Sequence, residues 1–441
     1  MYITISASTL TELNKITTLL ETVMASRLFY TKTATFQQLE GLQSVLPRGE
    51  KILSQKRNLD SSTAALTFPF VSSELVQDSG ILYGVNKSNN SLVIIDRFSL
   101  HNANSIVFAQ SGSGKSYTAK VEILRQLMQG TKVILIDPER EYKQLAKSVN
   151  GTYIKLSATS KEKINPFDLS LNSDDSLSTH VQDLTDIISL MGDGLNAEEK
   201  AVLDKAILKT YKDHGISMTK SKKNATYPLL KDLQKTLKEL GQKSLCRRLE
   251  KFTKGSLSSV FNSQTNIKLD NRLIIFDIKD LSESLRQIMM VVLSNFVYNQ
   301  VKSNPQKRML VIDEGWMLLQ HEESARFVAG LTRRARKYYL GVCIISQQAN
   351  DFLNSEYGKA IASQSSLRIL MRQDTTTIKK VASEFNLSEY EQKFLLTCER
   401  GEALIIADQN HVAVKIIASE KEHPLITTDP AERYLSREST N

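Results

Sequence analysis

One short stretch, AQSGSGKS beginning at Ala109, has residue types and spacing suited to holding phosphate groups. It follows the pattern glycine, four residues, glycine, lysine, then serine or threonine, with alanine in place of the first glycine. Gly112 and Gly114 let the backbone wrap closely, so that amide groups point at phosphate oxygens. Lys115 is spaced to reach the β- and γ-phosphates, and Ser116 to bind Mg²⁺. The stretch predicts a nucleotide site, against the simpler alternative of a glycine-rich turn with an incidental lysine.

Ala109 is a mild departure that a negative φ would accommodate. The nucleotide contacts are expected at Gln110, Ser111, Gly112, Ser113, Gly114, Lys115, Ser116 and Tyr117. No N-K-x-D guanine-reading motif is present, so ATP is the expected nucleotide.

A second stretch, RMLVIDEGW, supplies two carboxylates at the end of an apolar strand. The run Met309–Ile312 would deliver Asp313 and Glu314 to the sheet edge where ligands of open α/β sheets bind. Asp313 is expected to hold Mg²⁺ together with Ser116, and Glu314 to orient the attacking water. A strand ending in Asp-Glu means little alone, but with the phosphate loop it predicts ATP hydrolysis.

Polar and basic residues near other strand ends are further catalytic candidates. Gln347 ends the strand LGVCIIS and is placed to sense the γ-phosphate. Arginines that stabilise transition-state charge, from the same or a neighbouring subunit, are expected among Arg333, Arg336, Arg368 and Arg400. A solvated basic face is the alternative for each of them.

The stretch VILIDPEREY places Asp137 and Glu141 just past another apolar strand. Two interpretations of Asp137 stay open. It would either lie beside the nucleotide site or cap the helix that follows.

The elements around these motifs predict an α/β fold. A strand candidate at 105–110 that runs into the loop, an amphipathic helix at 115–129 and a strand at 132–138 form a βαβ unit, which implies a largely parallel sheet. Asp313 lies 198 residues after Lys115, a gap that an inserted subdomain would explain.

The expected domains follow from changes in pattern along the chain. The strand-like start MYITISA and a helix after it predict a small α+β piece, which we expect to be the remnant of a larger N-terminal domain. The expected boundaries are 1–75 for this piece, 76–174 and 263–425 for the ATPase core, 175–262 for an all-α insertion, and 426–441 for a C-terminal tail.

Composition narrows the class of protein. Apolar content of 41% and charged content of 24% are those of a globular protein, and the net charge is +9. Residues 218–254 carry eleven Lys or Arg against three Asp or Glu, which makes this segment a candidate for contacting nucleic acid or an acidic partner; a solvated helical face is the alternative. The three dispersed cysteines fit a reducing compartment, and no secretory signal or membrane-spanning run is evident.

Several stretches in order resemble one family: FPFVSSEL, AQSGSGKSYTAKVEILR, VILIDPEREY, INPFDL, VIDEGWMLL and RRARKYYLGVCIISQ. Over roughly residues 35–420 the chain resembles the type IV secretion and conjugation ATPases of the VirB class. The combination of FPF, the phosphate loop, DPEREY and INPFDL is far more specific than the loop alone.

The resemblance implies a RecA-like motor core with an all-α subdomain, ATP with Mg²⁺, and homo-hexameric rings. It also implies other secretion components as partners and a cytoplasmic location at the inner face of the membrane. A monomer or dimer stays open for this chain on its own. Two other functions stay open as well: a DNA-translocating RecA-like ATPase, and a nucleotide-dependent scaffold with little hydrolysis.

Overall fold

The structure is a computed structural model of the 441-residue chain. It describes residues 2–26, 29–46, 52–53, 60–61, 75–169, 177–216, 226–255 and 257–427. These fall into two compact units, 1–71 and 72–441, which are treated separately below. The FPF motif, most of the expected tail and residues 218–225 of the basic segment lie outside the described residues.

Unit 1 contains two described helices, α1 (Leu10–Ser26) and α2 (Gln38–Val45). The helix expected after the N-terminus is confirmed. The prediction of a strand at MYITISA is wrong, because residues 2–7 adopt no strand in the structure. An alternating pattern forms a strand only where a neighbour satisfies its backbone groups, and no ladder in the described part of the chain includes these residues.

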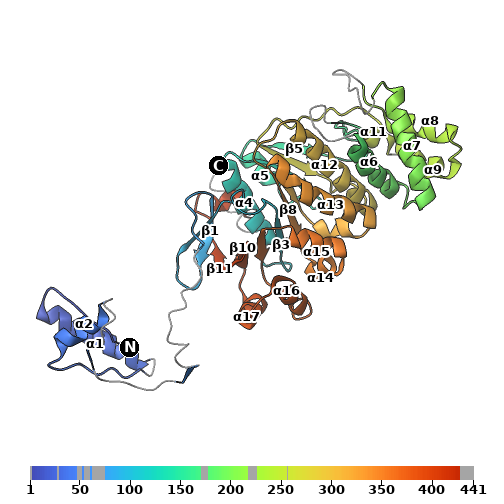
Figure 1. Ribbon diagram of the computed structural model, residues 1–441. Helices are drawn as coiled ribbons and strands as arrows, with labels where there is room; N and C mark the ends of the chain where they lie inside the picture. Colours follow the sequence, from blue (N-terminus) through green and yellow to red (C-terminus); the bar gives the residue numbers. More distant parts are fainter. Residues whose placement is uncertain are drawn as a thin grey trace. The chain divides into compact units, whose positions relative to one another are not determined.

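Unit 2 is built on one eleven-stranded sheet with the order β2-β1-β11-β10-β9-β3-β8-β7-β4-β6-β5 (Figure 1). The strands are β1 (Ile81–Asn86), β2 (Leu92–Ile95), β3 (Ser105–Phe108), β4 (Lys132–Asp137), β5 (Thr152–Lys155), β6 (Leu273–Asp277), β7 (Arg308–Ile312), β8 (Leu340–Ser346), β9 (Leu367–Leu370), β10 (Glu402–Ala407) and β11 (Asn410–Ile416).

The seven strands from β9 to β5 run parallel, and the other four are antiparallel. The parallel strands are apolar on both faces because helices cover both sides. In β4, Ile134 and Ile136 belong to one core layer, while Val133 and Leu135 belong to the other. The expected α/β fold with a largely parallel sheet is confirmed.

The helices divide between the two faces of the sheet. Helix α4 (Lys115–Met128), which follows the phosphate loop, packs with α5 (Lys143–Ser148) and α18 (His423–Ile426) on one face. Helices α12 (Glu283–Ser303) and α13 (Glu322–Ala335) pack in the core layer of the other face. The remaining elements of unit 2 are α14 (Ala349–Asn354), α15 (Glu356–Ser363), α16 (Ile378–Phe385), α17 (Glu389–Thr397), and the 3₁₀ turns η1 (Gly315–Leu319) and η2 (Arg336–Tyr338).

Between β5 and β6 the described residues 177–261 are largely helical, in the stretch where the sequence predicts an all-α insertion. It comprises α6 (Leu177–Met191), α7 (Ala197–Asp213), α8 (Leu230–Glu239), α9 (Lys243–Arg248), α10 (Glu250–Thr253) and α11 (Ser258–Phe261). Ion pairs fasten it to α13: Arg334 to Asp183 at 3.1 Å and Lys200 to Glu323 at 3.2 Å. The insertion thus attaches to the core through α13, and its helix α6 also packs against α12.

A buried histidine in the insertion should make the protein acid-sensitive. His180 is hydrogen-bonded through Nε2 to the Tyr211 hydroxyl at 2.9 Å, and burial, with a smaller effect of Lys302, lowers the pKa of His180 to about 3. An unfolded histidine titrates near pH 6.5, so the unfolded chain binds the extra proton between about pH 6.5 and 3. Folding stability contributed by the neutral imidazole is therefore complete above about pH 7 and decreases as the pH falls.

We expect His180→Gln to reduce the loss of unfolding free energy between pH 7 and pH 5 by about 2 kcal/mol. Glutamine keeps a donor for Tyr211 and does not titrate. Denaturant midpoints of both proteins at the two pH values measure this difference. Equal pH dependence in the two proteins would contradict the assignment.

Candidate nucleotide site

The phosphate loop connects β3 to α4 and has the backbone shape that its glycines allow. Gly112 and Gly114 have φ values of 81° and 102°, in the left-handed region that other residues rarely adopt. A Cβ at Gly114 would also approach the Gly401 nitrogen to 3.2 Å. Ala109 is buried and is not among the residues with positive φ, so its methyl group is accommodated as expected.

Three charged side chains from two strand ends meet beside this loop. Lys115 Nζ lies 2.9 Å from Asp313 Oδ1 and also donates to Glu314 Oε1. All three residues are at most 7% exposed. They come together because β3 and β7, on either side of β8, are parallel and end at the same edge of the sheet.

Glu314 is held by several donors at a strained position of the backbone. Its φ is 50°, in the left-handed region that residues other than glycine rarely adopt. Gln347 Nε2 donates to Oε1 at 2.7 Å, and Trp316 Nε1 donates to Oε2 at 2.8 Å. Gln347 therefore lies beside Glu314, immediately after β8, where the sequence placed it. Trp316, in the turn that follows Glu314, thus contributes a hydrogen bond to this carboxylate.

The charges of the cluster determine its protonation. Burial alone would lower the pKa of Lys115, but Asp313 and Glu314 outweigh it and raise that pKa, so the amine stays protonated. Burial alone would raise the pKa of Glu314, but the Lys115 ammonium and the hydrogen bonds hold it below the usual value. Burial raises the pKa of Asp313 and the Lys115 ammonium opposes that rise. Glu314 is thus ionised and able to accept a proton.

Asp137 lies beside the site, close enough to Asp313 for the two charges to interact. It does not cap the following helix α5, whose N-cap is Tyr142, and binds the intervening turn instead. Its carboxylate accepts backbone N–H groups from Glu139, Glu141 and Tyr142 at 3.0–3.3 Å. Burial, opposed by those backbone hydrogen bonds, raises the pKa of Asp137 to about 6. The turn in which it sits reaches Ser116, whose hydroxyl donates to Glu141 Oε2.

The arginine candidates occupy three different places in the fold. Arg400 is exposed and precedes Gly401, whose N–H donates to the Ser113 carbonyl of the phosphate loop at 3.0 Å. Arg333 and Arg336 are exposed at the end of α13 and in η2, which precede β8 and so lie at the opposite, amino edge of the sheet. Arg368 is partly buried in β9, with its guanidinium 5.8 Å from the Phe385 ring centroid.

The remaining loop candidates are placed as follows. Gln110 and Ser111 are exposed, and Ser113 Oγ donates to the Gln110 carbonyl at 2.6 Å. Tyr117, on the first turn of α4, contacts His423 Nδ1 at 2.9 Å through its hydroxyl.

Sequence reasoning missed two residues at this edge. Arg372 follows β9, is exposed, and its carbonyl accepts the Gln110 N–H at 3.0 Å. Tyr142 donates its hydroxyl to Asp313 Oδ2 at 3.2 Å. The sequence could have indicated Arg372, because this residue stands at the end of the strand that contains Arg368.

The side chains present fit a magnesium nucleotide. Among the described residues no group of three or more His, Cys, Asp or Glu side chains forms a metal centre by itself. Magnesium is commonly held by one or two protein oxygens together with substrate phosphates, and Ser116 and Asp313 would supply such oxygens. The single ammonium of Lys115 faces two carboxylates, so this cluster can accommodate further positive charge.

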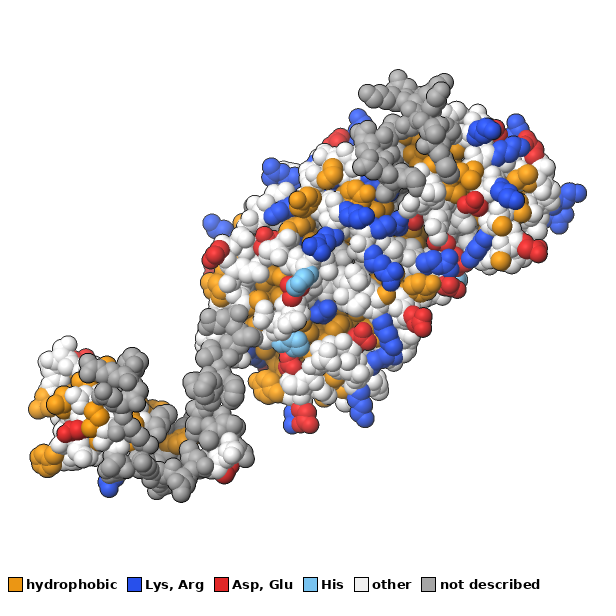
Figure 2. Space-filling model, viewed as in Figure 1, with side chains coloured by type: hydrophobic (Ala, Val, Ile, Leu, Met, Phe, Trp, Pro, Cys, Tyr) orange, Lys and Arg blue, Asp and Glu red, His pale blue; other side chains and the backbone are white. Residues whose placement is uncertain are grey.

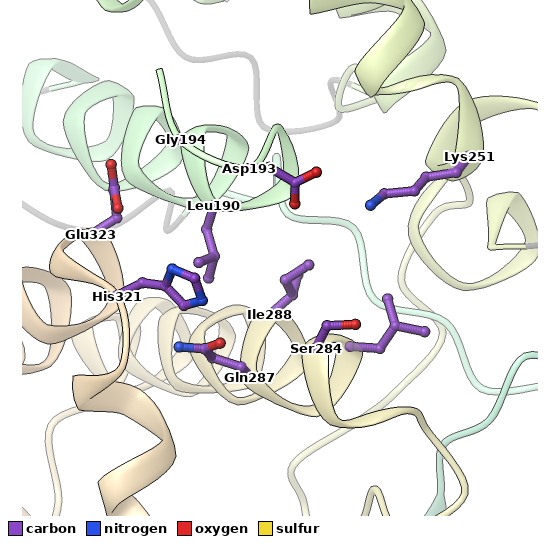
Figure 3. Close-up of a pocket in the computed structure, with 10 residues that line it drawn as sticks. Leu190, Asp193, Gly194, Lys251, Ser284, Gln287, Ile288, His321 and Glu323 are labelled. Carbon is purple, nitrogen blue, oxygen red and sulfur yellow. The ribbon is translucent and has the colours of Figure 1, made fainter. Parts of the chain in front are cut away.

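A separate cavity of about 150 Å³ lies between the insertion and the core, among residues that include Leu190, Lys251, Gln287 and His321 (Figure 3). Its polar lining side chains come from the loop after α6, from α10 and α12, and from the start of α13, and none belongs to the nucleotide cluster.

Comparison with known proteins places this chain in a family. Residues 89–422 match the TraG P-loop domain. The solved structure of VirB4 from Thermoanaerobacter pseudethanolicus is 31% identical, with a TM-score of 0.72, and covers 79% of this chain and 99% of that one. The plasmid coupling protein TrwB, solved in complex with ADP and Mg²⁺, is similar in fold alone, at 14% identity, a TM-score of 0.53, and coverage of 80% of this chain and 96% of that one.

Curated relatives agree but are much longer than the matched segment. The type IV secretion system protein VirB4 of Bartonella quintana is 26% identical over 191 residues, which are 42% of this chain and 24% of that protein. VirB4 of Bartonella henselae is 25% identical over 197 residues, or 41% and 25%. The chain therefore matches about a quarter of the length of these relatives. With its P-loop NTPase fold and the match over residues 89–422, the chain belongs to the TraG P-loop domain family and is a VirB4-like type IV secretion protein.

Proposed function

We propose that this chain is an ATP-hydrolysing motor subunit of a type IV secretion or conjugation system, which couples ATP turnover to apparatus assembly and substrate transfer. The observation that carries the proposal is the convergence of Lys115, Asp313, Glu314 and Gln347 beside the glycine loop. A buried lysine paired with two carboxylates has no evident structural advantage over apolar packing, which favours a catalytic role.

The proposed chemistry assigns each side chain a task. Lys115 leaves the carboxylates to contact nucleotide phosphates, and Glu314 then orients a water molecule and accepts its proton. Gln347 keeps the Glu314 carboxylate in place. Mg²⁺ with the nucleotide would neutralise charge that develops on the phosphates.

The arginine positions support a ring of subunits. Arg333 and Arg336 lie at the amino edge of the sheet, so they would reach only a neighbouring subunit's site, whereas Arg400 lies beside the loop of its own chain. The test is ATPase rate per subunit against protein concentration. We expect the rate to rise with concentration; a flat profile, with Arg400→Ala alone abolishing turnover, would exclude fingers supplied in trans.

A DNA-translocating ATPase is the second candidate function, favoured by the basic surface of the insertion. Lys231, Lys235 and Lys238 are exposed along α8 at helical spacing, and Figure 2 shows Lys and Arg side chains over the insertion. Strong stimulation of turnover by DNA, with a steep salt dependence, would favour this function. Turnover that DNA does not change would favour the secretion motor without direct nucleic-acid contact.

Location and partners follow from the family in this proposal. Among the described residues, no helix combines the length and apolar character needed to cross a bilayer. We place the chain at the cytoplasmic face of the inner membrane, in a hexamer docked on other secretion components.

Removing the Gln347 side chain should slow hydrolysis without preventing nucleotide binding. The hydrogen bond to the Glu314 carboxylate is charge-assisted, and losing about 1.4 kcal/mol of it in the transition state is a tenfold loss of rate. We expect Gln347→Ala to lower kcat about tenfold, measured by phosphate release. The neighbouring Gln348→Ala is the matched control, and equal rates for the two variants would contradict the assignment.

A further inference from the structure

The turn that follows β4, residues 137–142, contacts both halves of the nucleotide site. Glu141 accepts the hydroxyl proton of Ser116 from the phosphate loop, and Tyr142 donates its hydroxyl to Asp313 at 3.2 Å. Ser116 and Asp313 are the two residues expected at the metal. A single six-residue turn therefore touches both.

Hydrogen bonds and ion pairs hold the turn in place, so it can serve as a fixed support. Asp137 accepts three of its backbone N–H groups. Arg140 bridges Asp277 and Asp280, with both contacts at 2.6 Å. Glu139 contacts Arg286 of α12 at 3.0 Å. These anchors leave the Glu141 and Tyr142 side chains as the parts of the turn directed at the nucleotide site.

A serine hydroxyl binds a cation through an oxygen lone pair, and its proton must then point elsewhere. When a carboxylate accepts that proton, the lone pairs are directed at the metal and the oxygen becomes a better donor. Glu141 is the carboxylate in this place. In the same way the Tyr142 hydroxyl occupies one oxygen of Asp313 and leaves the other, which Lys115 now contacts, for the site.

We propose that Glu141 and Tyr142 are positioning residues that orient Ser116 and Asp313 toward the magnesium of a bound nucleotide. This inference rests on the proposed function, since it needs a magnesium nucleotide at the loop. It assigns neither residue a direct part in the chemistry.

The test is the affinity for a fluorescent ADP analogue in excess Mg²⁺ and in EDTA, which does not depend on turnover. We expect Glu141→Ala to weaken binding in Mg²⁺ about tenfold and to leave binding in EDTA unchanged. Glu141→Gln retains an oxygen that accepts the Ser116 proton and should lose less. Tyr142→Phe removes only the hydroxyl and should weaken the Mg²⁺-dependent part of binding several-fold.

Glu139→Ala is the matched control, because this carboxylate lies in the same turn but contacts Arg286 instead of the nucleotide site. The inference is overturned if Glu141→Ala and Tyr142→Phe keep the wild-type difference between Mg²⁺ and EDTA. It is also overturned if affinity falls equally in both conditions, which would assign the turn to loop shape alone. A wild-type protein that binds no nucleotide would instead reject the proposed function.

Discussion

Replacing Glu314 by glutamine is expected to lower the turnover number for ATP by about 10²–10⁴-fold, the contribution of a positioned general base. The amide keeps the size of the side chain but cannot accept a proton. It also replaces one acceptor oxygen by a donor. In the structure Lys115, Gln347 and Trp316 all donate to this side chain, so the new donor would face other donors. Because the carboxylate accepts its proton during the chemical step, the loss of activity should appear in kcat.

Nucleotide affinity of the Glu314→Gln protein should stay within a few-fold of wild type, because Lys115 and the loop backbone are unchanged. Single-turnover hydrolysis and equilibrium binding separate these two quantities. Glu322→Gln, an exposed carboxylate on α13, is the control for removing one negative charge. If Glu314→Gln retained a third or more of the wild-type rate, another group would have to be the base.

The same variant distinguishes a motor from a nucleotide-dependent scaffold. A scaffold would bind ATP and turn it over negligibly in the wild type, so the substitution would change nothing measurable in rate. A motor would lose turnover and retain bound ATP. Since the proposed arginine fingers come from a neighbouring subunit, both proteins need to be compared at the highest concentration that stays soluble.

The parts of the site that sequence could predict are those carried by local pattern. The loop from Gln110 to Ser116 is read from spacing, and the strand before Asp313 from four apolar residues. Their meeting follows from the rule that parallel strands end at one edge. Local pattern was therefore sufficient to predict that these two strand ends meet at the candidate site.

Contacts between distant segments could not be predicted from the local sequence pattern. The Tyr142–Asp313 hydrogen bond joins residues 171 positions apart and depends on β4 lying next to β7. No feature of DPEREY by itself says which strand neighbours it. The antiparallel end of the sheet was missed for the same reason, because β1 pairs with β11, which lies more than 300 residues later.

A buried ion pair behind the phosphate-loop helix should make unit 2 sensitive to the loss of either partner. Arg97 is fully buried, with Nη1 3.6 Å from Glu122 Oε1, and the Tyr83 hydroxyl donates to the same oxygen at 2.6 Å. The guanidinium also contacts Ser105 of β3 and Met309 of β7. The pair thus ties α4 to both the antiparallel and the parallel parts of the sheet.

Substituting Arg97 by methionine is expected to reduce the free energy of unfolding by about 3–5 kcal/mol, because Glu122 would remain buried without its cation. Guanidinium unfolding followed by circular dichroism measures the change. Arg272→Met, at an exposed arginine, should cost less than about 0.5 kcal/mol and controls for the substitution itself.

The double variant Arg97→Met, Glu122→Gln separates the cost of an unpaired charge from the worth of the pair. Glutamine keeps an oxygen for the Tyr83 hydroxyl but carries no charge. Because burying two ions costs nearly as much as their attraction returns, the double variant should regain most of the stability that Arg97→Met loses. If it stayed as unstable as the single variant, the contacts of Arg97 with Ser105 and Met309 would be the main source of its contribution. Recovery would mean instead that Arg97 is required chiefly because Glu122 is charged.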